Sequence, residues 1–456
     1  MLRLGKALAS LASLLAMLSQ APAARAQTCA GARPDYGGAD RAFHDSASGR
    51  VRVHFARAGA SAPPAESSLE DGVPDAVVVA AQAAEDALAE YERLGYEPPL
   101  SDGASPCADN GGSAALDVYL LHFSAADGQA GIDHCEPGTS RCAGFVLVEN
   151  DFRGAGYAST EEGVRTVVPH EVFHLVQNAY DADLERWWAE GSAQWAAKQV
   201  YPELQDLERF LPAYFDVPWR PLNVPPPGII TNFLYATAIW PVFLEERFGA
   251  DLVRAVFEEL NGAEGALPAA DRALQARGSS LASEFVQFAA YNAATGRRAP
   301  VSGGYESARE YPEVPVETLE ARTPTDTASG LGAFYYRVPE ASPELRLVAD
   351  PERVAALLLP LKDGQVDLAA AQPLPARTEG EAIVVVAAQT LARTDAPFEL
   401  VFASPSPTSG AESSGCSLAA PPGAPGPALL WLVGFALRRS SRQRKGDPRC
   451  ALCSSL

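Results

Sequence analysis

Residues 170–174 read His-Glu-Val-Phe-His and hold two of the six histidines in the chain. Histidines four positions apart share one face of a helix, so both imidazoles can bind a single metal ion. Glu171 follows the first histidine and is placed to take a proton from an attacking water molecule. The spacing therefore predicts one Zn²⁺ per chain, held by His170 and His174, with Glu171 as the general base.

A zinc ion on this helix needs a third protein ligand, and the sequence narrows the choice. No histidine follows His174, and both methionines lie within the first 17 residues, so the third histidine and methionine turn of metzincins are excluded. Carboxylates remain. Asp181, Asp183 and Glu185 lie in a polar connection, where we expect them to be solvated. Glu190 lies in the aromatic segment WWAEGSAQW, where an unpaired carboxylate would be costly to bury, so we predict it as the ligand.

Three further side chains near the motif are candidates for supporting roles. Gln177 shares the face of the two histidines, and Gln194 stands four positions after Glu190, so either amide could hydrogen-bond a zinc ligand. Packing at the edge of the core explains both glutamines equally well. Tyr235 could donate a hydrogen bond to a developing oxyanion, although aromatic packing in the core is the competing interpretation.

The elements that would carry these residues are predicted from capping signals and periodicity. Ser-Thr-Glu-Glu at 159–162 is a capping box, which predicts a helix from Thr160 to about Tyr180, and Pro169 should kink it. Further helices are predicted at 76–94, 190–200 and 236–247. Alternating or apolar runs predict strands at 51–55, 116–123 and 144–148. Glu70, Asp71 and Asp75 offer oxygen ligands for Ca²⁺, but their spacing lacks the EF-hand pattern.

The sequence character changes near residue 300, which indicates a second domain. From residue 331 to 403 the chain has short strand-like runs separated by turn residues, such as those at 333–338 and 382–387. We therefore predict an α+β protein in which the domain that carries the HEVFH motif is followed by a small all-β accessory domain. The predicted organisation is a signal peptide at 1–26, the motif-bearing domain at 27–300, the accessory domain at 301–403, a Ser/Pro/Gly linker at 404–427 and a tail at 428–456.

The first 26 residues and the cysteines indicate export. Arg3 and Lys6 precede an apolar stretch at 7–18, and Ala-Arg-Ala at 24–26 is a small-x-small cleavage site. The body of the chain, residues 27–403, contains an even number of cysteines suited to two disulfides. The last two bracket a short loop and could pair with each other, which would leave the first two to form the second disulfide, but the sequence alone does not fix the connectivity. These four cysteines are Cys29, Cys107, Cys135 and Cys142.

The charge distribution argues against a nucleic-acid partner. The formal net charge is −21, and residues 27–437 hold 27 basic against 56 acidic residues. Such a body repels nucleic acid and anionic lipid.

A cluster of basic residues lies in the C-terminal tail, after an apolar run. Cys416 lies in the linker, the apolar run covers 428–437, and Arg438 and Arg439 follow at once. Ten residues are too few to span a hydrocarbon core about 30 Å thick. We therefore interpret the tail as a sorting signal that places the protein at a membrane or cell surface through Cys416.

Four segments together resemble one family. They are HEVFHLVQ at 170–177, WAEGSA at 188–193, GVPD at 72–75 and LGY at 94–96. Over roughly residues 50–260, the chain resembles the secreted gluzincin-type metallopeptidases of predatory and soil bacteria. The resemblance implies a zincin-like fold, two histidine ligands, a glutamate ligand and a glutamate base. Pro169 departs from the small residue usual before the first histidine, and Ala197 stands where a glutamate often does. The tail is similar to myxobacterial C-terminal surface-sorting tails.

Three functions are compatible with these residues. The leading prediction is a secreted, surface-anchored zinc endopeptidase acting on protein or peptide substrates. An adhesion module that binds zinc without turnover is the alternative, but a purely structural zinc site has no need of a base such as Glu171 beside its ligand. A hydrolase acting on other substrates would use the same residues.

Overall fold

The computed structural model describes residues 33–403, apart from residues 104, 108, 124–125, 229, 262–263, 320–323 and 392–394. The chain divides into two units, residues 1–405 and residues 406–456. The predicted signal peptide, linker and tail therefore lie outside the described residues, as do Cys29 and Cys416. Within the described part of the chain, no helix is both long and apolar enough to cross a membrane.

A five-stranded mixed sheet forms the first layer, in the order β1-β2-β3-β5-β4. Its strands are β1 (Arg41–Asp45), β2 (Val51–Ala56), β3 (Leu116–Leu121), β4 (Gly128–Cys135) and β5 (Cys142–Glu149). β2, β3 and β5 are parallel, and β4 pairs antiparallel to β5 at the edge of the sheet. The predicted strands at 51–55, 116–123 and 144–148 correspond to β2, β3 and β5, whereas β1 and β4 were not predicted.

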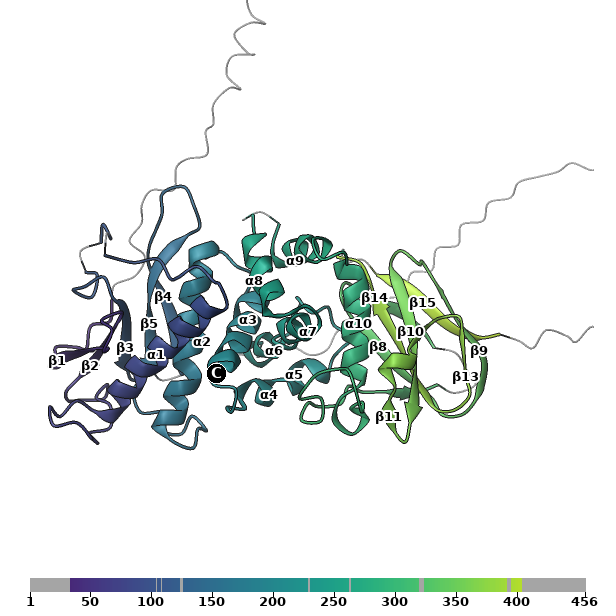
Figure 1. Cartoon of the computed structure of the whole chain (residues 1–456), viewed down its shortest axis with the longest axis horizontal. Helices are drawn as coiled ribbons and strands as arrows, with labels where there is room; N and C mark the ends of the chain where they lie inside the picture. Colours follow the sequence, from purple (N-terminus) through teal and green to yellow (C-terminus); the bar gives the residue numbers. More distant parts are fainter. Residues whose placement is uncertain are drawn as a thin grey trace, which may run out of the picture. The chain divides into compact units, whose positions relative to one another are not determined.

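Two long helices, α1 (Asp75–Arg93) and α2 (Thr160–Tyr180), pack against each other and against this sheet (Figure 1). The Oγ of Ser159 accepts a hydrogen bond from the backbone N–H of Glu162 at 3.1 Å, as the capping box predicts. α2 is one continuous helix through Pro169, and the hydroxyl of Tyr91 donates to the Pro169 carbonyl at 2.8 Å.

Among the described residues, eight shorter helices follow α2. They are α3 (Arg186–Val200), α4 (Asp206–Phe210), α5 (Pro212–Phe215), α6 (Thr231–Ala236), α7 (Ile239–Phe248), α8 (Ala250–Glu258), α9 (Ala266–Gln275) and α10 (Leu281–Ala293), followed by the 3₁₀ turn Gly296–Arg298. α3 begins four residues earlier than predicted, so Glu190 lies inside the helix rather than at its start. The helix predicted at 236–247 corresponds to α7, which begins three residues later, and α6 before it was not predicted. Gly249 ends α7 with a positive φ of 91°, at the position predicted.

The predicted β-rich region contains two sheets, ordered β11-β10-β14-β8-β6, with β12 paired to β10, and β13-β9-β15-β7. The strands are β6 (Glu317–Thr318), β7 (Thr325–Ala328), β8 (Ala333–Val338), β9 (Ser342–Ala349), β10 (Val354–Lys362), β11 (Gln365–Val366), β12 (Gln372–Pro373), β13 (Ala376–Thr378), β14 (Ala382–Ala388) and β15 (Ala396–Phe402), with a 3₁₀ turn at Leu368–Ala370. Val384 and Val386 face the core between the sheets, while Ile383 and Val385 join the core that includes α10. Both faces of β14 are therefore buried.

The described residues thus combine helices with several sheets, which agrees with the predicted α+β class.

The predicted disulfide between Cys135 and Cys142 is confirmed. The two cysteines form a cross-strand pair at the ends of β4 and β5 and are bonded to each other. Cys107 is also disulfide-bonded. The predicted pairing of Cys107 with Cys29 stays a prediction, since Cys29 is outside the described residues.

Candidate metal centre

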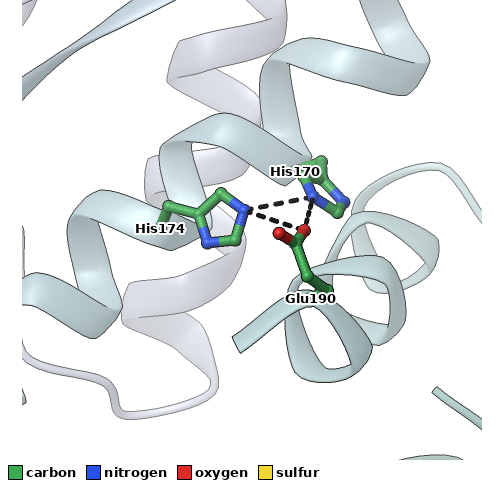
Figure 2. A group of neighbouring side chains, drawn as sticks. All are labelled: His170, His174 and Glu190. Carbon is green, nitrogen blue, oxygen red and sulfur yellow. Dashed lines mark hydrogen bonds and ion pairs between the residues drawn. The ribbon is translucent and has the colours of Figure 1, made fainter. Parts of the chain in front are cut away.

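Two adjacent helices bring the predicted zinc ligands together (Figure 2). His170 and His174 project from α2 toward Glu190 of α3. The Nε2 atoms of the two histidines are 3.2 Å apart. Oε2 of Glu190 lies 3.3 Å from Nε2 of His170 and 3.5 Å from Nε2 of His174. The three atoms thus form a nearly equilateral triangle.

The size of this triangle matches a tetrahedral zinc site. Zn–N and Zn–O bonds of about 2.0–2.1 Å at tetrahedral angles separate neighbouring ligand atoms by roughly 3.3 Å. The measured separations of 3.2, 3.3 and 3.5 Å bracket that value. His170, His174 and Glu190 would therefore hold Zn²⁺ and leave a fourth position open, as catalytic zinc sites do.

The other carboxylates weighed as ligands lie elsewhere. Over residues 33–403, with the gaps given above, His170, His174 and Glu190 are the one group of three metal-binding side chains with mutually close ligand atoms. The side chains of Asp183 and Glu185 are exposed, as expected for a polar connection. Asp181 was expected to be solvated, and this is wrong, because only 6% of the residue is exposed.

The calcium candidates Glu70, Asp71 and Asp75 do not form such a group in the described structure. Asp71 accepts the backbone N–H of Val73, and Asp75 accepts that of Ser68, so both carboxylates stabilise their own loop.

Gln177 holds one of the predicted ligands in place. Its Oε1 is 2.8 Å from Nδ1 of His174, and its Nε2 donates to the Ala189 carbonyl at 2.8 Å and to Oγ of Ser192 at 3.0 Å. The two acceptors on α3 fix the amide orientation, so Oε1 must accept from Nδ1–H of His174. That tautomer leaves Nε2 free to bind a metal, which is the supporting role predicted for Gln177.

Gln194 has a different partner from the one predicted. It donates to Oδ2 of Asp206 on α4 at 2.7 Å rather than to a zinc ligand. Burial raises the pKa of the Asp206 carboxyl, and the Gln194 hydrogen bond opposes that rise. Gln194 thus ties α3 to α4 beside the centre.

The three ligands form a charged cluster before any metal binds. Burial alone would lower the pKa of His174, but its hydrogen bond to Glu190 and the charge of Glu171 outweigh burial and raise it to about 9. Burial would raise the pKa of Glu190, but hydrogen bonds from both histidines hold it well below its usual range. At neutral pH, the metal-free cluster therefore holds a protonated His174 against an ionised Glu190.

Zinc binding is therefore expected to release about one proton from His174 between pH 7 and 8, because only the neutral imidazole binds the metal. The release should disappear as the pH rises above the His174 pKa of about 9, where the proton is already lost. Calorimetric titration with Zn²⁺ in buffers of different ionisation enthalpy measures this directly. A binding enthalpy that does not depend on the buffer would contradict the assignment.

Glu171 lies beside the triangle without belonging to it. It is 7% exposed, and burial raises the pKa of its carboxyl, opposed by the nearby charges of His174 and His170. A backbone hydrogen bond from Ala130 of β4 steadies the carboxylate. The raised pKa brings Glu171 nearer to the neutral range in which a general base exchanges protons most effectively.

Strand β4 approaches Glu171 so closely that only glycine fits at residue 128. A Cβ atom on Gly128 would lie 2.5 Å from Cγ1 of Val167 and 2.7 Å from Oε1 of Glu171. Either β4 or the Glu171 carboxylate would have to move to make room.

Gly128→Ala is therefore expected to displace Glu171 while leaving the zinc triangle intact. Any hydrolysis that depends on this base should fall at least about 100-fold, since a misplacement of 1 Å costs that much. Zinc content after dialysis and the rate of hydrolysis are the two measurements. Gly380→Ala, between β13 and β14, is the control, because a Cβ there meets nothing within 4 Å and the backbone is not in the left-handed region. A fully active Gly128→Ala protein would show that the close approach has no role.

Tyr235 of α6 also lies at the metal centre, beside His170. Its ring meets that of His170 edge-on, with centroids 5.5 Å apart. Burial raises the Tyr235 pKa, and the charges of Glu190 and Glu171 raise it further, so the hydroxyl keeps its proton at neutral pH. Gly191 allows α3 to approach α6 closely, since a Cβ there would lie 2.4 Å from Oγ1 of Thr237.

One cavity of about 310 Å³ joins these groups. Glu171, His174, Glu190 and Tyr235 line it together with residues 128–130 of the edge strand. The cavity can therefore admit a substrate to the metal-binding face, to a buried carboxylate and to a protonated phenol at once.

No protein-family model matches the chain, and no curated protein matches it in a sequence search.

Proposed function

We propose that the protein is a zinc-dependent peptidase with a zincin-like catalytic fold. The observation that carries the proposal is the ligand triangle of His170, His174 and Glu190, which fits tetrahedral zinc and has the buried Glu171 in the same cavity. A structural zinc site is closed by four protein ligands, whereas this one offers three and opens onto a cavity.

When bound, the zinc ion would supply Lewis-acid chemistry that activates water and polarises the scissile carbonyl. Glu171 takes the proton of the attacking water at its carboxylate and delivers it to the leaving amine. Tyr235 donates its phenolic hydrogen to the oxygen that becomes negative during the attack. Gln177 keeps His174 in the tautomer that binds the metal.

The position of β4 at the edge of its sheet supports the proposal that the substrate is a peptide. Gly128, Gln129, Ala130 and Ile132 line the cavity, and among the described strands β4 pairs only with β5. An extended peptide can therefore add to the free edge through backbone hydrogen bonds, which hold the chain without demanding a particular sequence. This arrangement favours a peptide over other classes of substrate.

The proposal is tested by measuring zinc per chain and cleavage of casein by the purified protein. One zinc per chain and cleavage blocked by a chelator are the expected results. Stoichiometric zinc without cleavage of casein or of a diverse peptide mixture would favour the adhesion module instead.

We further propose that the protein is exported and held at the cell surface. N-terminal sequencing of the exported protein is expected to begin at Gln27, and Cys416→Ala is expected to release protein into the medium. A mature chain that keeps Met1 would contradict export, and unchanged surface display of the Cys416 variant would contradict the role of the tail.

A further inference from the structure

A second recess lies next to the cavity at the metal centre, beyond the end of α2. Asp181 and Leu184 line both the first cavity and this neighbouring one of about 280 Å³. The second recess is also lined by Asp183, Glu185 and Glu264. A substrate side chain that enters beside His174 therefore meets Asp181, at the border of an acidic space.

Asp181 is placed to face this passage. It follows His170, His174 and Gln177 at helical spacing and caps the C-terminus of α2. Only 6% of the surface of Asp181 is exposed, yet Asp181 has no salt-bridge partner within the described part of the chain. Its Oδ1 accepts the backbone N–H of Asp183 at 2.9 Å. A buried carboxylate with so little compensation favours a cationic partner.

The surroundings strengthen the preference for a cation. Neither cavity is lined by a lysine or an arginine among the described residues. Glu264 pairs with Arg272 at 2.7 Å, and the side chain of Glu185 is exposed and accepts the backbone N–H of Ala266 at 2.8 Å. Of these three acids, Asp181 is the one that is buried without a salt bridge in the described part of the chain. The C-terminal end of the α2 dipole adds a partial negative charge at the same place.

We propose that Asp181 makes the peptidase select substrates with a lysine or arginine next to, or one residue removed from, the scissile bond. This inference rests on the proposed peptidase function. Asp181 lies seven positions after His174, about 10 Å along a helix axis. A long cationic side chain from a neighbouring position of an extended peptide can cover that distance, since successive residues advance about 3.3 Å.

The test compares matched peptides that carry lysine or norleucine at each position flanking the cleaved bond. Norleucine keeps the aliphatic chain and removes the charge, so the ratio of kcat/KM values isolates the cationic contact. The wild-type protein is expected to prefer lysine by about tenfold or more at one position. In Asp181→Asn the ratio should fall close to one, with zinc content and norleucine cleavage retained, because the amide still accepts the Asp183 N–H.

Glu161→Gln is the control, since its exposed charge lies in the first turn of α2, at the opposite end of the helix from Asp181, and should leave the ratio unchanged within about twofold. A wild-type protein that cleaves both peptides equally, or an Asp181→Asn protein that keeps the preference, overturns the role of Asp181 but leaves the peptidase function intact. A zinc-loaded protein that cleaves neither these peptides nor casein overturns both proposals.

Discussion

Glu171→Gln is expected to keep one zinc per chain and to lose most peptide hydrolysis. Glu171 is not part of the ligand triangle, so the metal should stay bound. Glutamine has nearly the same shape and can still accept the hydrogen bond from Ala130, but its amide cannot take a proton. Positioned proton transfer is worth roughly 10²–10⁴-fold, and kcat should fall by at least that factor.

A second glutamate of α2 is the control for this variant. Glu161 lies in the exposed first turn and pairs with Arg165 at 2.9 Å. Exposed pairs of this kind contribute less than about 1 kcal/mol, so Glu161→Gln should leave both activity and zinc unchanged. If Glu171→Gln remained active, the proposed mechanism would be wrong, and a different group would have to accept the proton.

Glu190→Ala is expected to lose zinc and activity together. The substitution removes one corner of the ligand triangle and leaves His170 and His174 as a pair 3.2 Å apart. Two histidines hold zinc weakly, and the loss of affinity should exceed the roughly 10–100-fold typical of removing a residue that only supports a ligand. Zinc per chain after dialysis, measured beside peptide hydrolysis, shows whether the two fall together.

Two neighbouring carboxylates give matched controls for the ligand assignment. Asp183→Ala and Glu185→Ala remove exposed acids from the connection between α2 and α3, and both proteins should keep stoichiometric zinc. If Glu190→Ala kept its zinc while one of these controls lost it, the third ligand would have been misassigned. This comparison separates loss of a ligand from a general loss of negative charge near the centre.

Local signals in the sequence were sufficient to predict the helix that carries the motif. The capping box placed the start of α2 at Thr160, and its end at Tyr180 also agrees. The spacing of His170 and His174 placed both on one face, because four residues complete about one helical turn. The aromatic surroundings of Glu190 favoured this carboxylate, and the structure brings it within 3.5 Å of both histidines.

Features that depend on distant parts of the chain could not be predicted in this way. β4 contains Gly128 and Gly131, which weaken any strand pattern, and its place at the sheet edge follows from pairing with β5. Asp181 stands in a polar connection, yet the packing that follows α2 buries it. Gln194 shares the helix of Glu190 but bonds Asp206, whose position depends on α4. In each of these cases, contacts with residues distant in the sequence determine where the side chain or strand lies, and a local sequence pattern does not contain that information.

The central claim is that a single zinc at His170, His174 and Glu190 makes this protein a peptidase. Its most direct test is to strip the protein with a chelator, add Zn²⁺ in known amounts and follow cleavage of one peptide. Hydrolysis is expected to be absent in the stripped protein, to rise in proportion to added zinc and to level off at one zinc per chain. Full activity in the stripped protein, or no hydrolysis at one bound zinc per chain, would contradict the account.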